Sequence, residues 1–95
     1  MKQAYEGEDV PVNVVYTDDQ DAATDPDSPP DIVITETDTD TEVVASTAMS
    51  SNGTGDYTYV WDTATDFGDP GVYEAEITAE FSTETKISRE EIRIV

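Results

Sequence analysis

Apolar and polar residues alternate along much of this chain, most regularly between residues 71 and 81. Every second residue there is apolar, in the order Tyr73, Ala75, Ile77, Ala79 and Phe81. Because side chains of a β-strand point alternately to the two faces of a sheet, this period of two predicts a strand with one buried face.

Shorter segments repeat the pattern and are separated by turn-forming residues. It predicts strands at about 9–16, 31–37, 42–49, 56–62, 71–81 and 86–95, with a connection rich in Asp and Pro at 17–30 and a hairpin loop at 50–55. No segment carries an apolar stripe with the 3.6-residue helical period. The chain, residues 1–95, is therefore predicted to be one all-β domain, an antiparallel β-sandwich of six to seven strands.

Two strands carry a feature that bears on their place in the sheets. Pro11 has no backbone N–H, which favours an edge position for the first strand. In the last strand, Ile87 has the opposite parity to Ile92 and Ile94. A β-bulge near residues 89–91 is predicted, since it would bring all three isoleucines to the inner face.

The aromatic residues indicate both the core and a fold type. Tyr57, Tyr59 and Trp61 fall on one face of a strand, and Asp69-x-Gly71-x-Tyr73 has the spacing of the tyrosine corner of immunoglobulin-like sandwiches. The predicted structural core comprises Tyr57, Tyr59, Trp61, Tyr73, Ile77 and Phe81. The alternative is a sugar-stacking platform, which would require Trp61 or Tyr5 to be exposed.

The charge of the chain is strongly negative. Against 23 Asp and Glu stand only 4 Lys and Arg, which gives a formal net charge of −19. Such a surface repels itself in dilute buffer, whereas molar salt screens it over about 3 Å, so the composition indicates a salt-saturated cytoplasm. It argues against nucleic acid and an anionic membrane as partners, because phosphates are bound by Lys and Arg. An acidic disordered segment is the rival interpretation, which the aromatic strands disfavour.

The residue types of catalytic and metal sites are scarce or uninformative here. The chain has no Cys and no His, and no nucleophile or phosphate-binding motif, so we expect no enzyme activity. Calcium could be bound by one of three acidic clusters, which are Asp18, Asp19, Asp21, Asp25 and Asp27, then Asp38, Asp40 and Glu42, then Asp66 and Asp69. None fits an EF-hand loop, and we expect no cofactor. The N-terminus has no apolar signal region, which for a full-length product predicts cytoplasmic synthesis.

The rare cations are concentrated at one end of the sequence. Lys86, Arg89 and Arg93 lie in the last predicted strand, and Lys2 is the only other cation. They either pair with glutamates such as Glu84, Glu90 and Glu91 or form a contact surface for an acidic partner. The two interpretations stay open at this stage.

The chain resembles small immunoglobulin-like structural proteins of tailed viruses. The resemblance rests on Ile32–Thr37 (IVITET), Gly55–Trp61 (GDYTYVW) and Gly71–Ile77 (GVYEAEI), and it fails at Asp18–Asp21, where the family has a turn glycine. Together with the acidity it implies a non-enzymatic virion protein of a haloarchaeal virus, assembled in the host cytoplasm. Its partners would be a major capsid or connector protein at the capsid surface or the head–tail junction, with a homo-oligomer allowed. The alternative is an immunoglobulin-like adhesion or cell-surface repeat of a halophilic archaeon.

Overall fold

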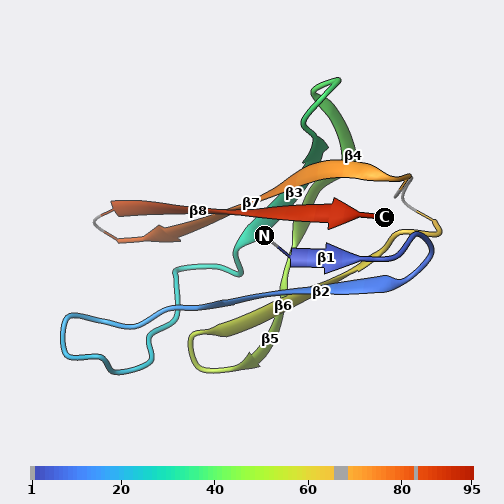
Figure 1. Cartoon of the computed structure of the whole chain (residues 1–95). Coiled ribbons are helices and arrows are strands. Elements are labelled where there is room, and N and C mark those ends of the chain that lie inside the picture. The colour runs from blue at the N-terminus through green and yellow to red at the C-terminus, as the bar shows by residue number, and fades with distance from the viewer. Residues whose placement is uncertain (1, 66–68, 83) are drawn as a thin grey trace.

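The computed structural model describes residues 2–65, 69–82 and 84–95, and these form two packed β-sheets without a helix (Figure 1). The five-stranded sheet has the order β1-β8-β7-β3-β4 and the three-stranded sheet the order β2-β6-β5. The strands are β1 Lys2–Ala4, β2 Asp9–Val15, β3 Asp31–Glu36, β4 Thr41–Ala48, β5 Ser50–Gly53, β6 Asp56–Asp62, β7 Gly71–Phe81 and β8 Glu84–Ile94. The predicted all-β sandwich is confirmed.

The described residues hold eight strands, so the predicted number of six to seven was too low. The two short strands β1 and β5 account for the difference. β1 has three residues, too few to show a period, and β5 has the sequence Ser-Ser-Asn-Gly, which is typical of a turn. Both are strands because of what they pair with: β1 runs parallel to the end of β8, and β5 runs antiparallel to β6.

The grouping of strands is that of an immunoglobulin-type sandwich. β2, β6 and β5 correspond to strands B, E and D of that fold, and β3, β7 and β8 to strands C, F and G. All pairs except β1 with β8 are antiparallel. β2, which contains Pro11, is an edge strand, as expected for a strand whose proline cannot donate to a ladder.

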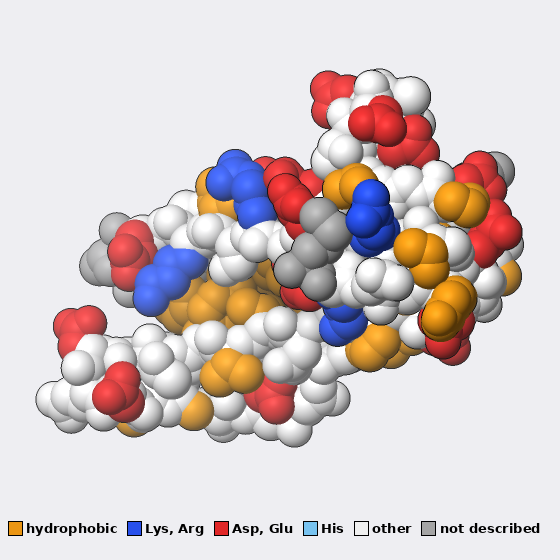
Figure 2. All heavy atoms as spheres, viewed as in Figure 1, with side chains coloured by type: hydrophobic (Ala, Val, Ile, Leu, Met, Phe, Trp, Pro, Cys, Tyr) orange, Lys and Arg blue, Asp and Glu red, His pale blue; other side chains and the backbone are white. Residues whose placement is uncertain are grey.

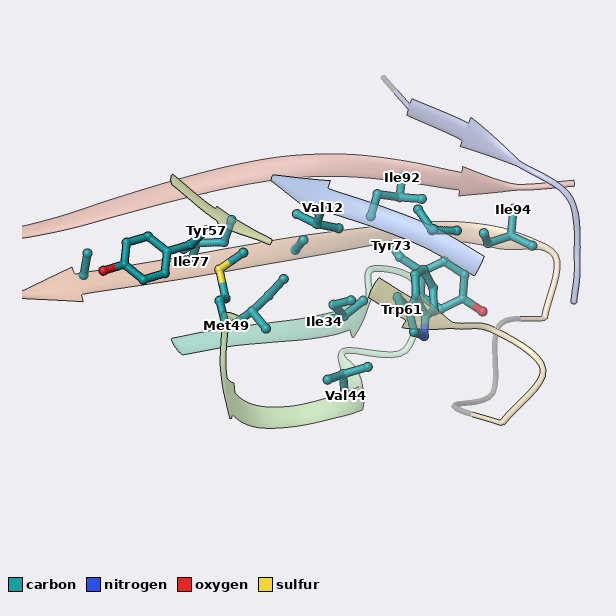
Figure 3. Packing of buried hydrophobic residues seen from close by; sticks show 14 of the residues in the cluster. Val12, Ile34, Val44, Met49, Tyr57, Trp61, Tyr73, Ile77, Ile92 and Ile94 are labelled. Atoms are coloured by element: carbon teal, nitrogen blue, oxygen red, sulfur yellow. The ribbon is translucent and has the colours of Figure 1, made fainter. Parts of the chain in front are cut away.

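Aromatic rings and isoleucines fill the space between the sheets (Figure 3). Trp61 on β6 and Tyr73 on β7 are fully buried and meet edge to face, with ring centroids 5.0 Å apart. Of the other residues assigned to the core from sequence, Tyr57 and Ile77 are buried, and Tyr59 and Phe81 are half-buried and pack against the cluster. The contact between Trp61 and Tyr73 thus connects the central strand of one sheet with the central strand of the other.

The tyrosine corner forms as its spacing suggests. The Tyr73 hydroxyl donates a 2.6 Å hydrogen bond to the backbone oxygen of Asp69. Burial raises the pKa of Tyr73 from 10.0 to about 12, and the negative charge of Glu36 adds to the effect. Because the folded state holds this proton more tightly, the associated stability is complete below pH 10 and is lost as the pH rises through about 12.

The bulge predicted in the last strand is absent, and that prediction was wrong. β8 pairs with β7 without interruption from Phe81↔Glu84 to Gly71↔Ile94. Ile87 therefore lies opposite Thr78 on the outer face, with 51% of its surface exposed, while Ile92 and Ile94 are buried. The hydrogen-bonded ladder between β7 and β8 is therefore unbroken, and Ile87 stays exposed as a consequence.

Candidate partner-contact surface

Strand β8 has a long free edge in the part of the chain that the structure describes. Its partner on one side is β7 over its whole length, but on the other side β1 covers only Ile92–Ile94. Along residues 84–91 no described strand pairs with the outer side of β8. We call β1 and β8 together the β1–β8 edge. Unpaired backbone groups make such an edge able to accept a further strand.

All four cations of the chain belong to this edge. Lys86, Arg89 and Arg93 are on β8, and Lys2 is on β1, opposite Ile92 in the register. Figure 2 shows the Lys and Arg side chains distributed over the face on which β1 and β8 lie, with Asp and Glu side chains between and around them. The parallel pairing of β1 with the end of β8 thus places Lys2 on the same sheet edge as the other three cations.

Local pairing accounts for part of this positive charge. Arg89 lies 3.1 Å from a Glu76 carboxylate oxygen and 3.7 Å from one of Glu74, both on β7. Lys86 lies 3.8 Å from Glu84 and above the Phe81 ring. These ion pairs are solvent-exposed and therefore contribute only about 0–1 kcal/mol each. Lys86 and Arg89 thus form ion pairs within the chain, and both stay at the surface.

Arg93 and Lys2 are less engaged with carboxylates. Within the described ranges Arg93 makes no ion pair, and it lies opposite Val72 on the outer face of the sheet. Lys2 donates a 2.6 Å hydrogen bond to the backbone oxygen of Pro11 on β2. The edge therefore keeps positive charge that a partner's carboxylates could reach.

An apolar side chain lies among these charges on the outer face. Ile87 is half exposed and precedes Arg89 by two residues, so the two side chains share that face of β8. Opposite them on β7 are Thr78 and Glu76. An exposed aliphatic side chain beside an arginine suits contact with another protein. The sequence did not predict that Ile87 is exposed, because its opposite parity to Ile92 and Ile94 predicts a bulge that would turn it inward.

A small hollow lies between this strand and the 17–24 loop, and Figure 2 shows it as a recess with an apolar floor. Its volume is about 230 Å³, and its lining comprises Thr17, Asp18, Asp19, Thr24, Phe81, Ser82, Glu84 and Lys86. The recess is smaller than the roughly 300–1,000 Å³ of ligand pockets and is open to solvent.

Several acids considered for calcium instead stabilise loops. Asp18 accepts hydrogen bonds from the backbone N–H groups of Gln20 and Ala22. Asp25 accepts one from Gly55 N–H at 2.7 Å and one from the Tyr57 hydroxyl at 3.1 Å. The structure described for this chain contains no group of three or more acids placed to hold a metal ion. Asp66, from the third candidate cluster, lies outside the described residues.

The sugar-platform interpretation loses its main residue. Trp61 is fully buried against Tyr73 and cannot stack on a ligand, although Tyr5 is 67% exposed. Of the two rings named for this role, Tyr5 alone has the exposure that the interpretation requires. No helix among the described residues has the length and apolar character of a membrane span.

Comparison with known proteins adds no assignment. No protein-family model matches the chain, and neither a curated protein nor a solved structure matches it.

Proposed function

We propose that this chain is a non-enzymatic assembly module that docks on another protein through the β1–β8 edge. The observation that carries the proposal is the presence of all four cations on one sheet edge, which no described strand covers along residues 84–91. A partner strand could add to this edge by backbone hydrogen bonding, while Ile87 and Arg93 would supply side-chain contacts. Carboxylates over much of the remaining surface would repel an acidic partner and so disfavour other docking positions.

The high negative charge supports a working environment of concentrated salt. At −19, the folded chain repels itself strongly unless counterions screen it. In such a cell most proteins are acidic, so an edge with positive charge distinguishes itself as a contact site. Salt would weaken long-range attraction, and close contacts around Ile87 and the backbone would supply most of the affinity.

The resemblance to small structural proteins of tailed viruses extends the proposal to a virion. In this account many copies occupy the capsid surface or the head–tail junction of a virus of a halophilic archaeon, and the partner is a capsid or connector protein. The immunoglobulin-type strand grouping supports the resemblance at the level of fold.

Density-gradient sedimentation in molar salt tests the virion role. Lysates and released particles from cells that carry the native gene would be separated and probed with an antibody against the chain. We expect the chain to co-sediment with virus particles at a fixed ratio to the shell protein. Recovery in the cell-envelope fraction would instead favour an adhesion repeat, and recovery only as free protein would contradict both functions.

A further inference from the structure

A second edge of the sandwich contains the longest uncharged stretch of the chain. Residues 43–55 include no Asp, Glu, Lys or Arg, although the whole chain has 23 acidic and 4 basic residues. The next longest uncharged stretch, residues 10–17, lies mostly in β2 and directs Val10, Val12 and Val14 toward the core, whereas Val15 is exposed. The segment 43–55 is therefore the longest stretch of the chain without a charged residue.

This segment forms the last strand of both sheets. β4 ends at Ala48, and β5 begins at Ser50, so the chain passes from the five-stranded to the three-stranded sheet between them (Figure 1). Met49 anchors the crossing: its side chain is buried, as Figure 3 shows, and its N–H donates to Pro30. We call residues 45–54 the β4–β5 edge, in which every residue except Met49 is exposed.

The β4–β5 edge lacks the protection found at the β2 edge. β2 carries Asp9 and Pro11 at its edge. Proline and charged side chains at an edge oppose pairing with a further strand. Along β4 and β5 the backbone groups that face away from β3 and β6 have no described strand beside them and no charged neighbour within the segment.

We propose that two copies of this chain meet at their β4–β5 edges, antiparallel across a two-fold axis. The charge of the chain selects this occupant, because two copies that each carry −19 can approach closely only where neither presents a carboxylate. A two-fold contact places the same surface on both sides, and an uncharged strand edge is complementary to itself. A partner with a charged docking surface would gain no electrostatic attraction here.

The contact is compatible with the proposed function and goes beyond it. β4 and the pair β1 and β8 lie at opposite edges of the five-stranded sheet, so a dimer leaves the β1–β8 edge free for another protein. An edge of ten residues is shorter than the roughly 20–30 residues a side of stable interfaces, so the isolated dimer is weak and depends on concentration. Molar salt strengthens it by screening repulsion between the remaining carboxylates.

Sedimentation velocity of the purified chain in molar KCl tests the proposal. We expect the sedimentation coefficient to rise with protein concentration, and to rise less in dilute buffer. Ser50→Asp places a carboxylate within the edge, and its matched control Ser28→Asp adds the same charge at an exposed position of the 17–30 connection. The dissociation constant of the dimer should increase at least about tenfold for S50D, since like charges across paired strands repel, and stay unchanged for S28D.

Three results would overturn the proposal: a wild-type chain that stays monomeric at every concentration in molar KCl, an S50D variant that dimerises like wild type, or equal weakening by both substitutions. Trp61 fluorescence during thermal unfolding verifies that each variant is folded. Should S50D fail to fold, Ser46→Asp on β4 takes its place with the same expected loss of dimerisation.

Discussion

Replacement of Trp61 by alanine should destabilise the fold by about 3–5 kcal/mol. The Trp61 side chain is fully buried on the central strand of the smaller sheet and contacts Tyr73 across the interior. Its removal leaves a cavity between the sheets that neighbouring side chains fill only in part. Since domains of this kind are stable by about 5–15 kcal/mol, the variant should lose a large share of its free energy of unfolding.

Urea unfolding in molar KCl, followed by circular dichroism, measures this change without relying on the fluorescence of the missing tryptophan. The matched control is Val60→Ala, the preceding residue on β6, which is 52% exposed and should change stability by less than about 0.5 kcal/mol. A loss below about 1 kcal/mol for W61A would contradict the placement of this ring in the core.

Gly55→Ala should be the other strongly destabilising substitution. Gly55 has φ +71°, and a Cβ there would lie 2.6 Å from the backbone oxygen of Tyr16 and 2.9 Å from that of Thr24. Backbone atoms cannot rotate away as a side chain can. The left-handed conformation alone costs an alanine about 1–2 kcal/mol. Displacement of the Tyr16 and Thr24 backbone should add about 1–3 kcal/mol.

Gly7→Ala separates the two contributions. Gly7 also has a positive φ, +88°, but a Cβ there would meet no atom within 4 Å. Thermal unfolding of both variants should show a clearly larger loss for G55A than for G7A. Equal losses would mean that the close approach of the 17–30 connection to Gly55 contributes nothing to stability.

The regular strands could be predicted from the sequence because their signal is local. In β7, five inward positions alternate with polar ones from Tyr73 to Phe81, which is the period of a strand with one buried face. The tyrosine corner was equally local, since Asp69 and Tyr73 are only four residues apart. Such features depend on the pleat of a strand or the geometry of a turn.

The features that the sequence did not reveal depend on partners far away in the chain. β1 is a strand only because it lies beside Ile92–Ile94, and Ile87 is exposed only because β8 pairs with β7 in unbroken register. The requirement for glycine at position 55 comes from the backbone of Tyr16 and Thr24. No period or motif within the segments themselves carries this information.

The candidate contact surface was predictable in part. The clustering of Lys86, Arg89 and Arg93 is visible in the sequence, but their free strand edge and the addition of Lys2 follow from the sheet order. Pairing with Glu84 or with β7, the alternative weighed from sequence, is present for Lys86 and Arg89. The opposite parity of Ile87 allows either a bulge or an outward isoleucine, and the sequence alone does not say which of the two occurs.

Cross-linking from two single cysteines tests the central claim, docking through the β1–β8 edge, most directly. The chain has no native Cys, so Ile87→Cys and Val60→Cys each offer one site, at positions 51% and 52% exposed on different sheets. Each variant would be labelled with a photoreactive maleimide and added back to the gradient fraction that holds the native chain. The account predicts a cross-link from position 87 to one defined protein of that fraction, and none from position 60. A cross-link to that protein from position 60 alone would contradict it.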